Sequence, residues 1–95
     1  MDISEVLVVG RHEEIMTTIL RLINSKAQLK GTAAFSVEEA EELGTRTSFD
    51  VVLLGAGLSA AESEAIRNDF TVPVVQHYGG GSGLLFAEIY QALGI

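Results

Sequence analysis

Runs of apolar residues alternate with segments of helical periodicity along the whole chain. Residues 6–9 are a continuous apolar run, and residues 49–54 are apolar except for Asp50, with an unbroken run at 51–54. Such runs are typical of strands buried on both faces, as in parallel sheets. Weaker runs at residues 29–35 and 72–76 predict two further strands, and the first of these is expected at an edge of the sheet.

Each predicted strand is followed by a predicted helix. Residues 12–25 carry apolar side chains at helical spacing, with glutamates in the first turn. Ser36 and Ser59 each precede a glutamate by three residues, which predicts a capping box at the start of the second and third helices. Gly44 is expected to cap the end of the second helix, and residues 84–93 to form the last one. Strands alternating with helices predict a parallel sheet covered on both faces, a three-layer α/β/α architecture.

Composition limits the classes of function. The 95 residues are expected to form one domain over residues 1–95, and the net charge of −7 opposes direct binding of nucleic acid. No cysteine is present, which excludes disulfides, thiolate catalysis and cysteine-ligated metals. The acidic residues near the start are unlike a signal peptide, and the first apolar run is too short to span a membrane. We therefore expect a cytoplasmic protein without membrane contact.

The ordered set of segments resembles the receiver domain of bacterial response regulators. The resemblance is carried by residues 5–9, 36–40, 49–54 and 72–75, and it covers roughly residues 5–78. It implies a flavodoxin-like fold with strand order 2-1-3-4 and a role in two-component signal transduction. The chain departs from the family after the fourth strand, where it runs directly into the last helix, so one βα unit is missing.

The residues that carry the family's chemistry are also replaced. In receiver domains two acids after the first strand hold magnesium, and an aspartate after the third strand accepts phosphate. The matching positions are Gly10, Arg11 and Gly55. Glycine has no nucleophile, and an arginine puts positive charge where a divalent cation needs hard oxygen ligands. The family's hydroxyl residue falls near His77 or Tyr78, and its lysine has no counterpart. The resemblance therefore implies a pseudo-receiver that is not phosphorylated.

The carboxyl ends of the predicted strands form a candidate ligand site. Open α/β sheets bind ligands there, and glycine-bearing loops beside basic side chains suit an anion. The candidate residues are Gly10, Arg11, His12, Gly55, His77, Tyr78, Gly80 and Gly81. The alternative is that the glycines only make tight turns and that the basic side chains are solvated, because neither a P-loop nor a dinucleotide-binding glycine motif is present.

Catalysis and metal binding are not expected. A metal site through His12 and His77 would need a third ligand, and only Glu13 or Glu14 is available nearby. Serines at predicted helix starts are better explained as caps than as nucleophiles. Since no arrangement supplies a nucleophile, a base and stabilising donors together, we predict no enzyme activity, no cofactor and no metal.

The last helix is apolar on more than one side, with only Glu88 and Gln91 clearly polar. Either it covers the gap left by the missing unit, or it packs on another subunit. The fourth strand lacks a fifth neighbour and is expected to be an exposed edge, which proteins usually cover or pair. We predict a homodimer with an interface that contains Val74, Leu85, Phe86, Ile89, Tyr90 and Leu93.

Two functions follow from these observations. The first is a non-enzymatic signalling or scaffolding module that acts through contacts with itself or with a signalling protein. The alternative is a sensor that binds an anionic metabolite or nucleotide at the strand ends. The fold analogy supports both only by association.

Overall fold

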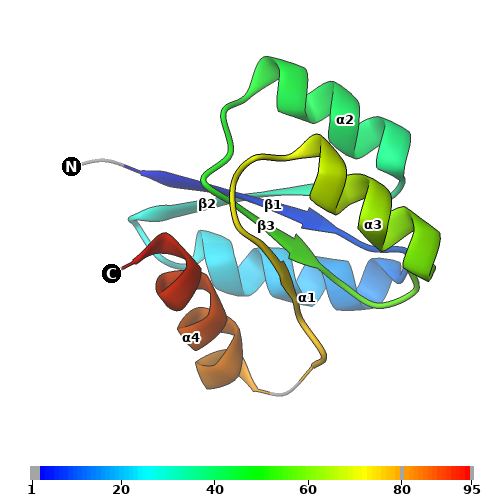
Figure 1. Ribbon diagram of the computed structural model, residues 1–95. Coiled ribbons are helices and arrows are strands. Elements are labelled where there is room, and N and C mark those ends of the chain that lie inside the picture. Colours follow the sequence, from blue (N-terminus) through cyan, green and yellow to red (C-terminus); the bar gives the residue numbers. More distant parts are fainter. Residues whose placement is uncertain (1–2, 80, 95) are drawn as a thin grey trace.

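The computed structural model describes residues 3–79 and 81–94, in which strands and helices alternate throughout (Figure 1). Their order is β1 (Ser4–Val9), α1 (Glu13–Asn24), β2 (Leu29–Ala34), α2 (Val37–Arg46), β3 (Val51–Leu54), α3 (Ala60–Asp69), β4 (Val74–Gln76) and α4 (Ser82–Leu93). All neighbouring strands pair in parallel, in the order β2-β1-β3-β4. The predicted α/β/α architecture and strand order are therefore confirmed. Two boundaries near the end of the chain differ from the prediction. Strand β4 begins two residues later than predicted, and α4 begins two residues earlier.

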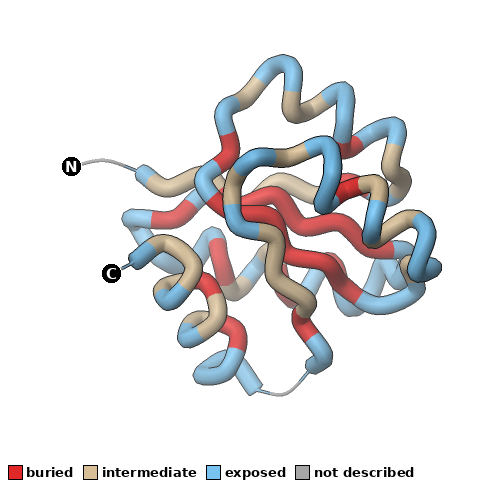
Figure 2. The backbone as a smooth tube through the Cα atoms, viewed as in Figure 1, coloured by how far each residue is buried: buried red, intermediate tan, exposed pale blue. Residues whose placement is uncertain are grey.

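The helices cover both faces of the sheet, with α1 and α4 on one face and α2 and α3 on the other (Figure 1). The core is divided in the same way. Val6 and Val8 of β1 pack with α1 and α4, whereas Leu7 and Val9 pack with α2 and α3. All four side chains are fully buried, as are those of β3, and the centre of the sheet is the most buried part of the molecule (Figure 2). This two-sided burial explains why the central strands are continuous apolar runs in the sequence.

The two predicted capping boxes differ in the structure. At α3 the box is complete, because Ser59 Oγ accepts from the Glu62 N–H at 3.1 Å and Glu62 Oε1 accepts from the Ser59 N–H at 3.0 Å. At α2, Ser36 Oγ accepts from the Glu39 N–H at 3.1 Å, but Glu39 Oε1 accepts from the Phe35 N–H at 2.6 Å. The prediction of a complete capping box at α2 is therefore wrong in one contact, because Glu39 bonds to the amide of Phe35 and not to that of Ser36. The Glu39 carboxylate satisfies the amide before the N-cap instead of the N-cap amide itself.

The prediction that Gly44 caps the end of α2 is wrong. The helix continues through it to Arg46. A Cβ atom on Gly44 would lie 2.9 Å from Cε1 of Phe70, whose ring packs against α2 from the end of α3. The glycine is thus needed for the close approach of an aromatic ring, a tertiary requirement that a local capping rule does not describe.

Each edge strand has a backbone group covered by a side chain from a helix. On β2 the Gly31 N–H donates to Asn24 Oδ1 at 2.9 Å. On β4 the Arg67 guanidinium donates to the Val74 carbonyl at 2.9 Å. In a parallel strand alternate residues bond to the same neighbour, and in β4 the residue that bonds to β3 is Val75. The backbone N–H and C=O groups of Val74 and Gln76 therefore point away from β3. Covered edges disfavour the addition of a further strand.

Candidate functional site

The strand order brings the carboxyl ends of β1, β3 and β4 to one edge of the sheet. Gly10 follows β1, Gly55 follows β3 and His77 follows β4. A Cβ atom on Gly10 would lie 3.4 Å from Gly55 Cα, and the His77 N–H donates to the Leu54 carbonyl at 2.9 Å. Residues from three loops, all predicted as candidates from the sequence, therefore meet at this edge.

The two glycines lie over the core. A Cβ atom on Gly10 would lie 2.8 Å from Met16 Sδ, whereas one on Gly55 would make only ordinary contacts, the closest at 3.4 Å to the Val9 carbonyl oxygen. Gly10 therefore allows α1 to approach the end of β1, and a larger residue there would displace Met16. Gly55 has no such steric role.

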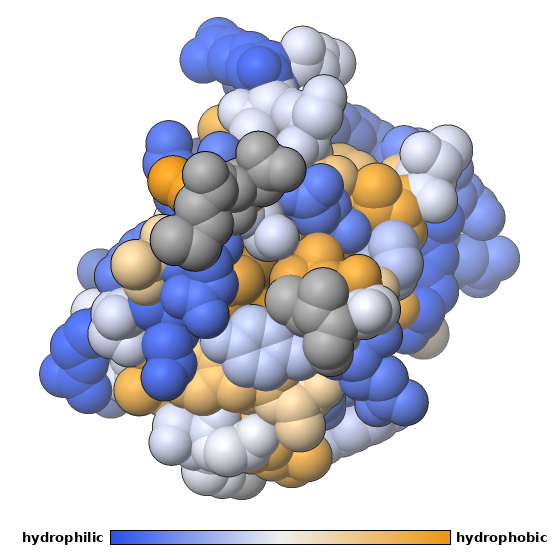
Figure 3. All heavy atoms as spheres, turned by 90° about the vertical axis from the view of Figure 1, so that its left-hand side faces the viewer, coloured by the Kyte–Doolittle hydropathy of each residue, from blue (hydrophilic) through white to orange (hydrophobic). Residues whose placement is uncertain are grey.

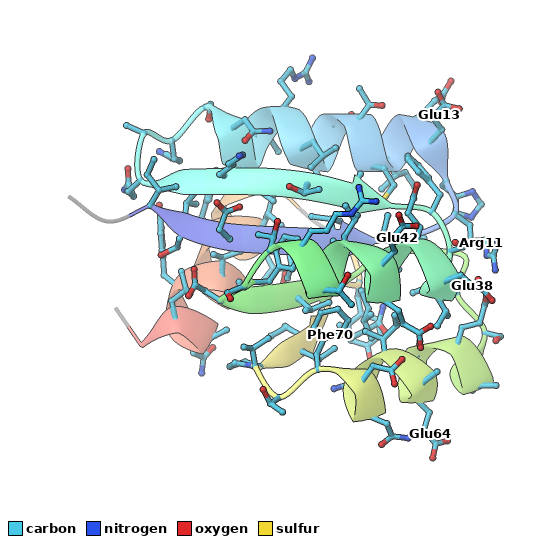
Figure 4. The ribbon with its side chains drawn as sticks, turned by 90° about the horizontal axis from the view of Figure 1, so that it is seen from above. Arg11, Glu13, Glu38, Glu42, Glu64 and Phe70 are labelled. Carbon is cyan, nitrogen blue, oxygen red and sulfur yellow. The ribbon has the colours of Figure 1, made fainter. Side chains whose placement is uncertain are left out.

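Arg11 pairs with α3. Its guanidinium donates to the Glu62 carboxylate, and the pKa of Glu62 is lowered first by the Ser59 N–H that it accepts and then by Arg11. Figure 4 shows Arg11 at the same end of the sheet as the acidic side chains of Glu13 and Glu38. An anionic ligand would have to compete with Glu62 for this guanidinium, so the positive charge at the strand ends is largely neutralised.

His12 and Arg11 pack against the turn between β3 and α3. Gly57 in that turn has φ of +93°, and a Cβ atom there would lie 2.8 Å from Arg11 Cβ and 3.2 Å from His12 Cδ2. Only glycine satisfies both the backbone conformation and this contact. The imidazole of His12 is thus packed beside the turn, at an exposed position just before α1.

His77 is the only polar residue among the described residues that is counted as buried, with 8% of its surface exposed. Its Nδ1 lies 2.5 Å from Oε1 of Glu88 on α4, whose side chain is 17% exposed. A carboxylate can only accept, so Nδ1 carries the hydrogen and, in the neutral ring, Nε2 keeps a lone pair. Sequence reasoning singled out His77 but missed Glu88. The two are eleven residues apart across a glycine-rich turn, where no periodic pattern pairs them.

A cavity of about 590 Å³ opens beside His77, between α1 and the turn from β4 to α4. It gathers half of the predicted ligand residues, namely Gly55, His77, Tyr78 and Gly81. Gly10, Arg11 and His12 do not line it, and Gly80 lies outside the described residues. The remaining lining residues, which are not among the eight candidates, are Glu14, Ile15, Thr18, Ile19, Leu22, Ala56, Gln76, Gly79 and Leu85.

A second cavity, of about 520 Å³, lies at the opposite end of the sheet, beside the ends of α2 and α3. Glu41 and Asp69 line it, and the pKa of Glu41 is raised by its hydrogen bond with Asp69 and by repulsion between the two carboxylates. Across residues 3–79 and 81–94, no group of three or more histidine, cysteine, aspartate or glutamate side chains could hold a metal ion. Over the same residues, no helix has the length and apolar character needed to cross a membrane.

No protein-family model and no curated protein matches the sequence. Solved structures do match. A two-component response regulator from Clostridium difficile superposes with a TM-score of 0.79 at 15% identity, over 96% of each chain. The fold is receiver-like. An orphan response regulator of H. pylori matches with a TM-score of 0.66 at 15% identity, over 95% of this chain and 96% of that one.

A chain in which part of the trimeric coiled coil of yeast Spc42 is fused to another protein matches with a TM-score of 0.77 at 18% identity. That match covers 96% of this chain and 79% of the other. At these identities the comparisons show the flavodoxin-like receiver fold alone. Function has to be argued from the residues at the strand ends.

Proposed function

We propose that this chain is a pseudo-receiver, a non-enzymatic cytoplasmic module that signals or scaffolds through protein contacts and is not phosphorylated. The observation that supports it is the chemistry at the ends of β1 and β3. Gly10 and Gly55 are buried there and bring no carboxylate, and Arg11 is paired with Glu62. An aspartyl phosphate needs a carboxylate nucleophile and oxygen ligands for magnesium, and Gly10, Arg11 and Gly55, which directly follow β1 and β3, supply neither.

We expect the protein to remain unmodified when it is incubated with acetyl phosphate and magnesium, because Gly55 stands where receiver domains have the acceptor aspartate. Intact-mass spectrometry checks this, with an active receiver domain as the positive control. Beryllofluoride should likewise leave the amide chemical shifts of Gly10, Gly55 and His77 unchanged. A phosphorylated species, or shifts confined to these three residues, would contradict the proposal.

The contacts of the module include a second copy of the chain, bound through α4. Leu85 and Ile89 are buried within this chain's own core, so the predicted interface narrows to the partly exposed Phe86, Tyr90 and Leu93. The rings of Phe86 and Tyr90 stack with centroids 6.1 Å apart. Figure 3 views the side that carries both chain ends and shows hydrophobic residues gathered on its lower half, where α4 lies. We call Phe86, Tyr90 and Leu93 the α4 patch.

Val74 of β4 was predicted to lie in this interface, but its position in the structure does not support that. The Val74 side chain packs with the core on the α2 and α3 face, away from α4. Its outward carbonyl is already bonded to Arg67. Val74 therefore does not belong to the proposed interface, and α4 supplies the apolar side chains that a partner would cover.

We expect the wild type to be a dimer at micromolar concentration, and Tyr90→Glu or Phe86→Glu to raise the dissociation constant by at least about tenfold, because a buried carboxylate loses its hydration. Multi-angle light scattering measures this. Ala87→Glu is the matched control, since Ala87 is exposed on the same helix and is expected to leave the dimer intact. A monomeric wild type would remove the dimer from the proposal, and dimers in all three variants would place the interface elsewhere.

A further inference from the structure

The cavity beside His77 has the size and lining of a small-molecule site. Its volume of about 590 Å³ lies within the usual range of such sites, about 300–1,000 Å³. Ile15, Ile19 and Leu22 form the wall on α1, and Leu85 forms the wall on α4. Ile15 remains 46% exposed, so the wall is open to an apolar ligand. Figure 1 shows that α1 and α4 lie on the same side of the sheet.

Three side chains of the cavity offer hydrogen-bond acceptors to a ligand. The His77 side chain is 7% exposed and its Nδ1 is held by Glu88, so Nε2 is the nitrogen left for a ligand. Gln76 uses its amide nitrogen to donate to the Leu54 carbonyl at 3.1 Å, which leaves the amide oxygen as an acceptor. Glu14 adds a carboxylate. A ligand that fits these groups donates hydrogen bonds.

The charge around the cavity excludes anions. No lysine or arginine is found among its described lining residues, and Glu14 contributes a carboxylate. Arg11, the cation expected from the sequence to hold an anion, lies outside the cavity and is paired with Glu62. The whole chain also carries a net charge of −7. An anionic ligand would meet repulsion here without a compensating ion pair.

We propose that this cavity binds an uncharged, mainly apolar small molecule that donates a hydrogen bond to Nε2 of His77. The apolar body lies along Ile15, Ile19 and Leu22, and the donor group faces His77. The site is separate from the α4 patch, because Phe86, Tyr90 and Leu93 do not line it. The proposal is independent of the dimer and of the lack of phosphorylation, so either can fail while the other holds.

Two dyes with the same aromatic skeleton test the ligand class. N-phenyl-1-naphthylamine is neutral and apolar with one N–H donor, and 8-anilino-1-naphthalenesulfonate adds a sulfonate to that skeleton. In fluorescence titrations of the folded protein we expect saturable binding of the neutral dye and at least about tenfold weaker binding of the sulfonate. Equal or tighter binding of the sulfonate would overturn the ligand class, and no saturable binding of the neutral dye would overturn the site.

Adjacent threonines on α1 provide matched variants that locate the dye. Both are exposed, but Thr18 lines the cavity and Thr17 does not. Thr18→Trp should fill the cavity and weaken binding of the neutral dye by at least about tenfold, while Thr17→Trp leaves it within about twofold. Circular dichroism verifies that both variants fold. Unchanged binding in Thr18→Trp, or loss of binding in Tyr90→Glu, would move the dye out of the cavity and overturn the proposal.

Discussion

Ile66→Ala is expected to lower the free energy of unfolding by about 2–5 kcal/mol, the usual cost of truncating a fully buried isoleucine. Ile66 is the only residue of α3 that is fully buried, and it packs with Leu7, Val52 and Leu54 of the sheet. The other partly buried residues of α3 are Glu62, Ser63 and Ala65, so the helix has no second large apolar side chain to hold it on the sheet. Urea unfolding monitored by circular dichroism measures the change.

The matched control is Ile15→Ala, the same substitution on α1 at a side chain that is 46% exposed. Both variants gain the same helix propensity from alanine, so the difference between them reports burial alone. We expect Ile15→Ala to change stability by less than about 1 kcal/mol. Similar losses in the two variants would show that Ile66 does not anchor α3.

The order and type of the elements could be predicted from the sequence because they depend on local patterns. Buried parallel strands are short apolar runs, and the helices between them begin with serine caps or acidic first turns. Apart from the shifted contact of Glu39, which is local, the errors came where a distant residue decides the local structure. Gly44 looks like a helix end until the ring of Phe70, which follows α3, is placed against it. Likewise, Arg67 covers the Val74 carbonyl only because α3 lies above β4.

The candidate site was predictable in position but not in chemistry. The rule that ligands bind at the carboxyl ends of parallel strands located Gly55 and His77 correctly at one edge. The sequence gives no means to see that Glu62 neutralises Arg11, since they are 51 residues apart and belong to different βα units. It is this pairing, together with Glu14 in the cavity, that changes the expected ligand from an anion to a neutral molecule.

Two side-chain pairs share an arrangement, in which a residue just after a strand bonds to an acid on a helix. Arg11 follows β1 and pairs with Glu62 of α3, and His77 follows β4 and pairs with Glu88 of α4. Each pair ties a strand end to a covering helix. The first pair is partly exposed and the second is mostly buried, so the second should contribute more to stability.

His77→Ala is expected to lower the free energy of unfolding by about 1.5–3 kcal/mol, the range for a hydrogen bond to a charged group. The loss has two sources: the bond to Glu88 disappears, and a carboxylate that is only 17% exposed is left without its partner. Glu88→Gln keeps an oxygen acceptor of the same reach and should lose less than Glu88→Ala. The double variant His77→Ala with Glu88→Ala should lose less than the sum of the two single ones, because each single variant already breaks the bond.

The coupling energy from this cycle, obtained by urea unfolding, is expected to exceed about 1 kcal/mol. The matched control is the same cycle on Glu42 and Arg46, an i,i+4 pair with side chains 62% and 70% exposed. Exposed helical pairs of that kind contribute about 0.3–0.5 kcal/mol. If the coupling energies of the two cycles were equal, the hydrogen bond to Glu88 would not hold the His77 side chain in place. The fixed orientation of its Nε2, on which the cavity's preference for a hydrogen-bond donor depends, would then be lost as well.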